Sequence, residues 1–258
     1  MDLTKLFRLD GRKAVVVGGA GGIGAALSKG LAIYGADVVI SSRNIERLKE
    51  IAGNLQSETG RDIVPIQADA TIDSDVERLV KETLSIFGTV DILVNSQGIN
   101  IKADALNFST NDWTRLFDIN VKSIMLTCRE FGKVMVQKKY GKIINVSSVR
   151  GARATKWPGN LGYCTSKGAV DMFTKALAAE FGVHNVNVNA IAPALVDTGF
   201  SPTLKDTERL KLYTSNIPMG RIAFLEDLIG ACVFLASPAS DFINGQIIYI
   251  DGGLTTIG

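Results

Sequence analysis

A tyrosine, a lysine and a serine in the middle of the chain have the chemistry to move a proton at a carbonyl or alcohol oxygen. Tyr163 and Lys167 are four residues apart in the run YCTSK, so a helix would place both on one face. An ammonium group beside a phenol favours the phenolate, which predicts a Tyr163 pKa below the ordinary value of about 10. Ser148, at the end of an apolar run, could hydrogen-bond the substrate oxygen. A tyrosine–lysine pair at this spacing is more often a helix surface pair, so the hypothesis that these residues interconvert C–OH and C=O depends on the surrounding elements.

Short, almost wholly apolar runs alternate with helical patterns along the chain. Such runs are typical of parallel strands buried on both faces, and strict alternation predicts right-handed crossovers. We expect a single-domain α/β Rossmann fold over residues 1–258, with a doubly wound seven-stranded parallel sheet and helices on both faces. Residues 194–224 lack a strand and are interpreted as a substrate lid or insertion. Strands are expected at Ala14–Val17, Val38–Ile40, Ile63–Ile66, Ile92–Val94, Ile143–Val146, Val186–Ile191 and Ile247–Ile250, and long helices from about 109 to 138 and from 163 to 181.

A glycine-rich run, GGAGGIG, joins the first expected strand to the first expected helix. Glycines permit a tight turn and the close approach of a pyrophosphate, and the helix N-terminus offers free N–H groups. Flexible turns are also rich in glycine, but the position of this run inside a β-α-β unit favours dinucleotide binding. The residues of the run that we expect at the cofactor are Gly18, Gly22, Ile23 and Gly24.

The end of the second expected strand indicates which dinucleotide is bound. An acid there would hydrogen-bond the ribose 2′-hydroxyl of NAD, whereas an arginine suits the 2′-phosphate of NADP. The residues present are Ser41, Ser42 and Arg43, with no acid among them. An arginine–phosphate contact about 4 Å long gains roughly 4 kcal/mol at an effective dielectric of 20, before desolvation costs. We therefore expect NADP(H) to be preferred, with NAD(H) possible; the alternative is that Arg43 only solvates the loop.

The overall composition excludes several functional classes. The chain has 258 residues, 46% of them hydrophobic, which suffices for one large core. A net charge of +2 gives no sign of a nucleic-acid-binding tail, and no apolar run reaches the roughly 18 residues that span a bilayer. The three cysteines fit no disulfide or zinc spacing, the single histidine cannot build a metal site, and the first residues lack a secretion signal. We expect a cytoplasmic protein that acts on a small molecule, with no metal and no nucleic-acid or membrane partner.

Further short motifs follow in order along the chain. They are Asp69-Ala70, the turn Asn95-Ser96-Gln97-Gly98, Asn120 within DINV, Ser148, Tyr163 with Lys167, the run NAIAP ending at Pro193, and Asp251-Gly252-Gly253. In this ordered set, together with the glycine run, the chain resembles the short-chain dehydrogenase/reductase family over nearly its whole length. It departs from the family where Val17 replaces a threonine, where Ser96-Gln97 replaces Asn-Ala, and where Ala194 replaces a glycine.

The resemblance implies a role for each motif residue. Tyr163 would be the general acid/base, Lys167 would bind the nicotinamide ribose and lower the tyrosine pKa, and Ser148 would orient the substrate oxygen. Asn120 would hold a water that connects Lys167 to solvent. The remaining cofactor residues that it implies are Asp69 at the adenine, Ala70, Asn95 and Gly98, and Pro193, Val196 and Thr198 beside the nicotinamide.

The substrate is indicated only by polar residues near the expected site. Arg150 and Arg153 follow Ser148, and Asn100 and Lys102 follow the fourth strand. Guanidinium groups suit carboxylates, so we expect a sugar, sugar acid or other small polar hydroxy compound, similar to the gluconate 5-dehydrogenase-like branch of the family. Both arginines could equally be surface charges of a loop.

Two alternative functions are kept open. The first is reduction of a 3-oxoacyl thioester on an acyl carrier protein, for which Arg115, Lys122, Arg129 and Lys133 could form a basic landing patch. The second is a non-catalytic dinucleotide-binding protein, against which the intact catalytic set argues.

The apolar tail from Ile247 to Ile257 has little polar cover, and the resemblance implies a homotetramer in which such a tail packs on a partner chain.

Overall fold

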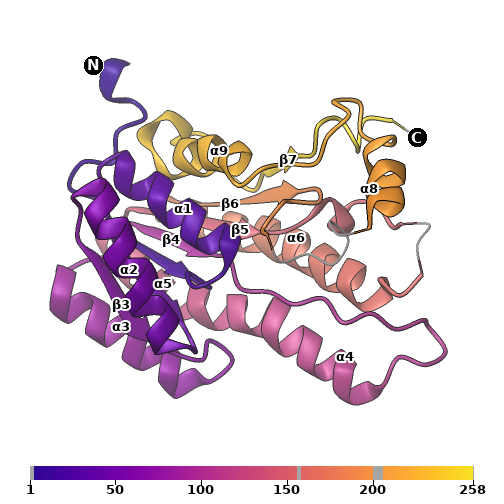
Figure 1. Cartoon of the computed structure of the whole chain (residues 1–258). Helices are drawn as coiled ribbons and strands as arrows, with labels where there is room; N and C mark the ends of the chain where they lie inside the picture. The colour runs from indigo at the N-terminus through magenta and orange to yellow at the C-terminus, as the bar shows by residue number, and fades with distance from the viewer. Residues whose placement is uncertain (1–2, 156–157, 200–205, 258) are drawn as a thin grey trace.

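One parallel sheet organises the chain. The computed structural model describes residues 3–155, 158–199 and 206–257. Seven strands pair in the order β3-β2-β1-β4-β5-β6-β7, and every pairing is parallel (Figure 1). The predicted doubly wound seven-stranded sheet is confirmed, with strands β1 (Lys13–Val17), β2 (Asp37–Ser42), β3 (Ile63–Gln67), β4 (Ile92–Asn95), β5 (Gly141–Val146), β6 (Val186–Pro193) and β7 (Ile247–Ile250).

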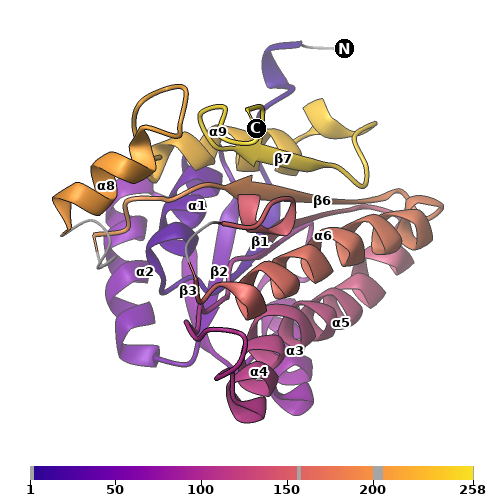
Figure 2. The same ribbon diagram turned by 90° about the vertical axis from the view of Figure 1, so that its right-hand side faces the viewer.

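Helices cover both faces of this sheet and create two separate cores (Figures 1 and 2). One core joins the sheet to α1 (Gly22–Ile33), α2 (Ile45–Thr59) and α9 (Glu226–Ala236). The other joins it to α3 (Asp73–Phe87), α5 (Ser123–Lys138) and α6 (Leu161–Gly182). Residues of β5 and β6 are buried throughout, including the polar side chains of Lys142, Asn187 and Asn189, so both faces of the central sheet are covered.

The ends of several helices follow from local sequence. Asn44 caps α2, since its side chain accepts a hydrogen bond from the Arg47 N–H. Gly60 and Gly88 end α2 and α3 in the left-handed conformation, which glycine adopts without a steric cost. Further short elements of the described chain are the 3₁₀ turns η1 (Leu3–Lys5), η3 (Val149–Gly151) and η4 (Pro238–Ser240), and helices α4 (Thr110–Phe117) and α8 (Thr207–Thr214).

The single long helix expected over residues 109–138 is interrupted. A π-helical turn, η2 (Asp118–Lys122), separates α4 from α5 and contains the buried Asn120. The Asn120 amide nitrogen donates to the Ile99 carbonyl (2.9 Å) and to the Ser166 hydroxyl (3.0 Å), while its amide oxygen accepts from the Ile99 N–H (2.8 Å). These contacts with two distant segments hold the wider turn, and π-helical turns are frequent at functional sites.

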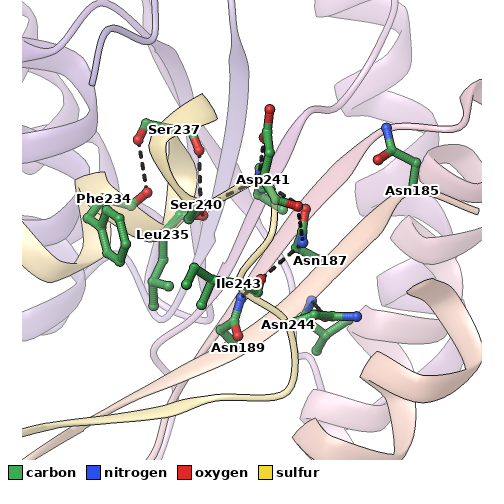
Figure 3. Close-up of polar contacts among 12 residues, drawn as sticks. Asn185, Asn187, Asn189, Phe234, Leu235, Ser237, Ser240, Asp241, Ile243 and Asn244 are labelled. Carbon is green, nitrogen blue, oxygen red and sulfur yellow. Dashed lines mark hydrogen bonds and ion pairs between the residues drawn. The ribbon is translucent and has the colours of Figure 1, made fainter. Parts of the chain in front are cut away.

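A polar network joins the α9–β7 connection to the amino ends of β5 and β6 (Figure 3). The Asn187 amide donates to the carbonyl oxygens of Asp241 (3.1 Å) and Ile243 (3.0 Å), and the Asn189 amide donates to Ile243 (2.9 Å). Lys142, which is 1% exposed, donates to the side chains of Asn187 (2.9 Å) and Asp241 (2.7 Å). This network lies at the edge opposite the carboxyl ends of the strands, so it supports the fold rather than the site.

The segment 194–224 lies beyond the carboxyl end of β6. Val196 forms a parallel bridge with Ala223, which joins the two ends of the segment, and α8 occupies its middle. Residues 200–205 of the expected lid lie outside the described residues. In the described part of the chain, no helix combines the length and the apolar character that crossing a membrane requires.

Candidate active site

The structure brings Ser148 and Tyr163 together at the carboxyl ends of the strands. Ser148 follows β5 and Tyr163 lies in the first turn of α6, and their side chains are hydrogen-bonded. The Ser148 oxygen also accepts the Arg150 N–H (3.2 Å). Both residues line a cavity of about 620 Å³, the active-site cavity, together with Asn100 and Asn160. A hydroxyl and a phenol that meet at one cavity wall can both contact a single substrate oxygen.

Lys167 lies one helical turn beyond Tyr163 and is almost completely buried. Its Nζ is 5.7 Å from the centroid of the Tyr163 ring and donates to the Val146 carbonyl (2.7 Å). Burial lowers the pKa of Lys167 to about 8, and the nearby carboxylate of Asp171 acts in the opposite direction. The Lys167 ammonium group therefore loses its proton more readily than that of an ordinary lysine, but it is still mostly charged at neutral pH.

The pKa of Tyr163 differs from the sequence-based expectation. Burial raises it above the ordinary value, and the hydrogen bond with Ser148 only partly offsets this effect. The expectation of a lowered Tyr163 pKa is wrong, because desolvation of the phenol has the larger effect and the Lys167 ammonium donates to a backbone carbonyl instead of to the phenol. Tyr163 is thus a protonated phenol at neutral pH, which is the form that can donate a proton.

These two pKa values predict how ketone reduction depends on pH. Tyr163 stays protonated at neutral pH, whereas Lys167 loses its charge as the pH rises through about 8. Because the ammonium stabilises the phenolate that forms when the phenol gives up its proton, we expect kcat for reduction to be level below pH 7 and to fall above pH 8. Initial rates at saturating cofactor and substrate between pH 6 and pH 10 would check this, and a level profile to pH 10 would contradict it.

The glycine run forms the tight turn that a dinucleotide requires. Gly18 has a φ of +83°, and a Cβ built on it would lie 2.6 Å from the Gln97 backbone nitrogen. A Cβ on Gly24 would lie 2.2 Å from the Gly18 carbonyl oxygen, and one on Gly22 would lie 3.2 Å from Thr198 Cβ. Side chains are therefore excluded where the chain turns into α1, and Thr198, which the resemblance places beside the nicotinamide, lies next to this turn.

A second, smaller cavity of about 150 Å³ lies beside this turn, and we call it the glycine-loop cavity. It brings together predicted cofactor residues from four strand ends, namely Gly18, Ser42, Arg43, Asp69, Ala70 and Gly98. The side-chain oxygens of Ser42 and Gln97, both lining residues, are buried and have no hydrogen-bond partner among the described residues. Unpaired buried oxygens beside a glycine turn fit the adenosine half of a dinucleotide, whose hydroxyl and amino groups would complete their hydrogen bonds.

The side chains of two predicted cofactor residues, Asn95 and Asp69, form hydrogen bonds with other residues of the chain. The Asn95 amide is fully buried, donates to the Asn145 amide oxygen (2.9 Å) and accepts from Thr127 (2.7 Å). The Asp69 carboxylate accepts from the backbone N–H (3.0 Å) and hydroxyl (2.7 Å) of Thr71. Asn95 is thus held in the centre of the sheet, so a contact with the cofactor is left to its backbone.

Residues predicted beside the nicotinamide or the substrate divide into two groups. The Pro193 carbonyl accepts a hydrogen bond from Ser148 (3.4 Å), and Asn100 and Arg150 line the active-site cavity. Arg153 is not among the lining residues: its guanidinium donates to the carbonyl oxygens of Leu254 and Ile257 (3.0 Å for Ile257). The structure therefore does not bring Arg153 to the substrate but uses it to hold the C-terminal segment.

Sequence reasoning missed other residues at the active-site cavity and at the glycine turn. Arg209 and Tyr213, on α8, line the active-site cavity opposite the strand ends. Arg47, on α2, donates from its Nε to the Ala20 carbonyl in the glycine turn (3.0 Å). No motif marks these three positions, and only the packing of α2 and α8 reveals them.

Comparison with known proteins agrees with this geometry. A family described as Enoyl-(Acyl carrier protein) reductase has a sequence profile that matches residues 18–255. Gluconate 5-dehydrogenase of Gluconobacter oxydans (strain 621H) is 36% identical, and the match covers 99% of each chain. The 3-oxoacyl-[acyl-carrier-protein] reductase of Chlamydia trachomatis is 34% identical over 94% of this chain and 97% of its own.

The solved structures show the same relationship. A gluconate 5-dehydrogenase from Burkholderia cenocepacia J2315, solved in complex with NADP and tartrate, has a TM-score of 0.94 at 35% identity. The likeness covers 98% of this chain and 99% of that one. The chain belongs to the short-chain dehydrogenase/reductase family and is an oxidoreductase that acts on CH–OH groups.

Proposed function

We propose that the protein interconverts a secondary alcohol and a ketone in a sugar acid or a similar small hydroxy acid, with NADP(H) as its preferred cofactor. The observation that carries this proposal is the charge of the active-site cavity, whose lining includes Ser148 and Tyr163. Three cations, Lys102, Arg150 and Arg209, also line it. A cavity with a hydrogen-bonded acid/base pair and a cationic rim suits a polyhydroxy carboxylate.

The balance of charge in this cavity favours an anionic substrate. Among the lining residues that the structure describes, the one acid is Asp206, and its carboxylate caps α8 by accepting the Arg209 N–H (3.0 Å). One Arg150 nitrogen donates to the Ala154 carbonyl (3.0 Å), which anchors the side chain while its other N–H groups can face the cavity. The amides of Asn100 and Asn160, which contact each other at 3.2 Å, add groups that suit sugar hydroxyls.

Each member of the catalytic set has a separate role in the proposed reaction. The nicotinamide, when bound, supplies or accepts the hydride. Ser148 orients the substrate oxygen, and Tyr163 donates its phenolic proton to that oxygen during reduction or accepts a proton during oxidation. Lys167 stabilises the phenolate, and Asn120 positions the Ile99 backbone and Ser166 beside it.

The proposed cofactor preference is supported by the end of β2. Ser42 and Arg43 line both the glycine-loop cavity and a neighbouring hollow shared with Asn44 and Gln67. None of the described residues that line this hollow is an acid, whereas a guanidinium and a serine oxygen with no partner in the described chain suit a 2′-phosphate. The related gluconate 5-dehydrogenase of Burkholderia cenocepacia was solved with NADP. NAD(H) can still serve as a weaker cofactor.

The alternative of a carrier-protein-bound substrate is less well supported. Of the four cations suggested as a landing patch, three form ion pairs: Lys122 with Asp118 (3.7 Å), Arg129 with Asp73 (2.8 Å), and Lys133 with Glu130 (2.6 Å). Paired charges attract an acidic partner less strongly than free ones. Because the relative from Chlamydia trachomatis is a 3-oxoacyl-[acyl-carrier-protein] reductase, 3-oxoacyl thioesters are included in the assay.

The experiment that tests the proposed function is a substrate panel. Purified protein would be assayed with NADPH and NADP⁺, and with NADH and NAD⁺, against keto-sugar acids, sugar acids, neutral polyols and 3-oxoacyl thioesters. We expect the highest kcat/KM on a sugar acid with the phosphorylated cofactor. A higher kcat/KM on acyl thioesters would favour the alternative, and NADPH binding without turnover on any substrate would favour a non-catalytic role.

Arg150→Ala tests the recognition of the carboxylate. Loss of a charged hydrogen bond at a half-buried site is expected to raise KM for the acidic substrate about tenfold and to change kcat less. The KM of the variant for a matched neutral polyol should be unchanged. Arg150→Lys should restore part of the affinity for the acid, because lysine keeps the positive charge but lacks the paired N–H donors of the guanidinium. An unchanged KM for the acid would contradict this role of Arg150.

Assembly into a homotetramer is part of the proposal. Several large apolar side chains are exposed on the described chain, including Met172, Phe242 and Ile257, which is consistent with partner contacts. Light scattering during gel filtration measures the assembly, and a monomer would contradict the proposal.

A further inference from the structure

The turn after β4 contains a side chain that the family pattern does not predict. Gln97 stands where the family has alanine, next to Gly98 at the carboxyl end of the strand. Its amide nitrogen donates to the Ser123 hydroxyl (3.0 Å). That hydroxyl in turn donates to the Ile119 carbonyl (2.6 Å), so its own proton is engaged and it must act as the acceptor toward Gln97. The Gln97 amide is therefore oriented with its nitrogen toward Ser123 and its oxygen away from it.

The oxygen of this amide is buried and unpaired. Gln97 Oε1 has no hydrogen-bond donor within the described parts of the chain, although it is shielded from bulk solvent. A buried acceptor without a donor is costly, and such groups in native proteins usually receive a partner from a ligand or a water. Gln97 and Ser123 both line the glycine-loop cavity, together with Ser42, Arg43 and Asp69. The unpaired oxygen therefore belongs to a cavity that can supply its donor.

We propose that Gln97 is a cofactor-binding residue, whose amide oxygen accepts a hydrogen bond from the adenosine half of the dinucleotide. The inference rests on the proposed use of NADP(H). With the 2′ position phosphorylated, the adenosine half still offers an amino group and a ribose 3′-hydroxyl as donors. In the same cavity, the Oδ1 atom of Asp69 is engaged by two hydrogen bonds from Thr71, whereas the Gln97 oxygen has none within the described residues. Gln97 thereby adds a polar contact that an alanine cannot make.

Gln97→Met separates this role from simple packing. Methionine has a similar length and keeps the cavity filled, but it carries no strong acceptor. If the oxygen is paired in the complex, its loss weakens the binding of NADPH about three- to tenfold. If the oxygen stays unpaired in the complex, the apolar replacement removes a desolvation cost from both states, and affinity is unchanged or higher. Weaker NADPH binding by the variant therefore indicates a paired oxygen, whereas equal or tighter binding indicates an unpaired one.

The measurement is a dissociation constant, determined by calorimetry and by quenching of intrinsic fluorescence. Adenosine 2′,5′-bisphosphate, which carries only the adenosine half, should lose affinity by the same factor as NADPH, while nicotinamide mononucleotide should bind unchanged. Gln56→Met, an identical change at an exposed position on α2, is the control and should bind all three ligands like the wild type. If Gln97→Met does not fold, Gln97→Ala removes the same oxygen and is expected to act in the same direction.

The outcomes distinguish this inference from the proposed function. If the wild type binds neither NADPH nor adenosine 2′,5′-bisphosphate, the proposed cofactor is wrong and the inference falls with it. If the wild type binds both and the Gln97 variants bind them equally well or better, only the inference is overturned. A loss confined to nicotinamide mononucleotide would also overturn it, because the contact would then lie at the other half of the cofactor.

Discussion

Replacement of Tyr163 with phenylalanine is expected to lower kcat about 10³-fold while leaving NADPH affinity unchanged. The substitution removes one oxygen from a buried ring, so the ring continues to pack beside Ser148 and Lys167. What is lost is the proton that the phenol gives to the substrate oxygen, and general acid catalysis of this kind contributes about 10² to 10⁴ in rate. The pKa of Tyr163 is raised by burial, so the wild-type phenol holds this proton at neutral pH. Steady-state rates with the best substrate of the panel, and a fluorescence titration with NADPH, measure the two quantities.

The control for this experiment is Tyr34→Phe, which removes the same oxygen from an exposed tyrosine at the end of α1. Its kcat should match that of the wild type. Near-normal turnover of Tyr163→Phe would show that another group protonates the substrate, and the mechanism built on Tyr163 would be wrong. A large loss of NADPH affinity would instead indicate that the phenol acts mainly by holding the cofactor.

The sheet could be predicted from sequence because most of its strands are short and largely apolar. Runs such as Ala14–Val17 and Ile92–Val94 have no polar side for solvent, and a sheet covered by two helical layers buries both of their faces. The positions of Gly18, Ser42 and Ser148 followed from the same rule, since residues after parallel strands gather at one edge. The glycine turn was predictable as well, because steric exclusion at Gly24 depends on neighbours only a few residues away.

Features that depend on distant contacts could not be predicted from sequence. The helical period continues through residues 109–138, but the π-helical turn exists because Asn120 bonds to Ile99 and Ser166, which are 21 and 46 residues away in sequence. Likewise, Arg153 looked like a cavity residue because it follows Ser148, yet its partners lie at the C-terminal end of the chain. A side chain as long as arginine can reach many positions, and only the fold selects one.

The same limit applies to the chemistry of the catalytic pair. Spacing placed Tyr163 and Lys167 on one face of α6, and this is correct. Spacing does not report the depth of burial, which raises one pKa and lowers the other. Tyr163 is therefore a neutral phenol beside a lysine with a lowered pKa, rather than the phenolate–ammonium pair that the spacing suggested.

Arg43→Ala is expected to lower kcat/KM for NADPH about 30-fold and to change kcat/KM for NADH less than about threefold. The guanidinium is exposed at the end of β2, so solvent reduces the roughly 4 kcal/mol of unscreened attraction to a 2′-phosphate, and a charged hydrogen bond at such a site contributes about 2 kcal/mol. NADH lacks this phosphate and gains nothing from the charge. Both cofactors would be titrated at a fixed, saturating concentration of the same carbonyl substrate, and the ratio of the two kcat/KM values reports the preference.

Salt and charge reversal make this prediction more stringent. Because the contact is electrostatic and exposed, the preference of the wild type for NADPH should shrink as ionic strength rises, whereas the Arg43→Ala variant should show little salt dependence. Arg43→Glu should go further and favour NADH, since a carboxylate repels the 2′-phosphate and can accept a hydrogen bond from the ribose 2′-hydroxyl.

The control is Lys49→Ala, which removes a cation from the exposed face of α2, where it pairs with Glu46. This variant should leave the ratio of the two kcat/KM values unchanged. If Arg43→Ala lowers kcat/KM equally for both cofactors, Arg43 contacts a part that they share, and the preference for NADP(H) must come from elsewhere.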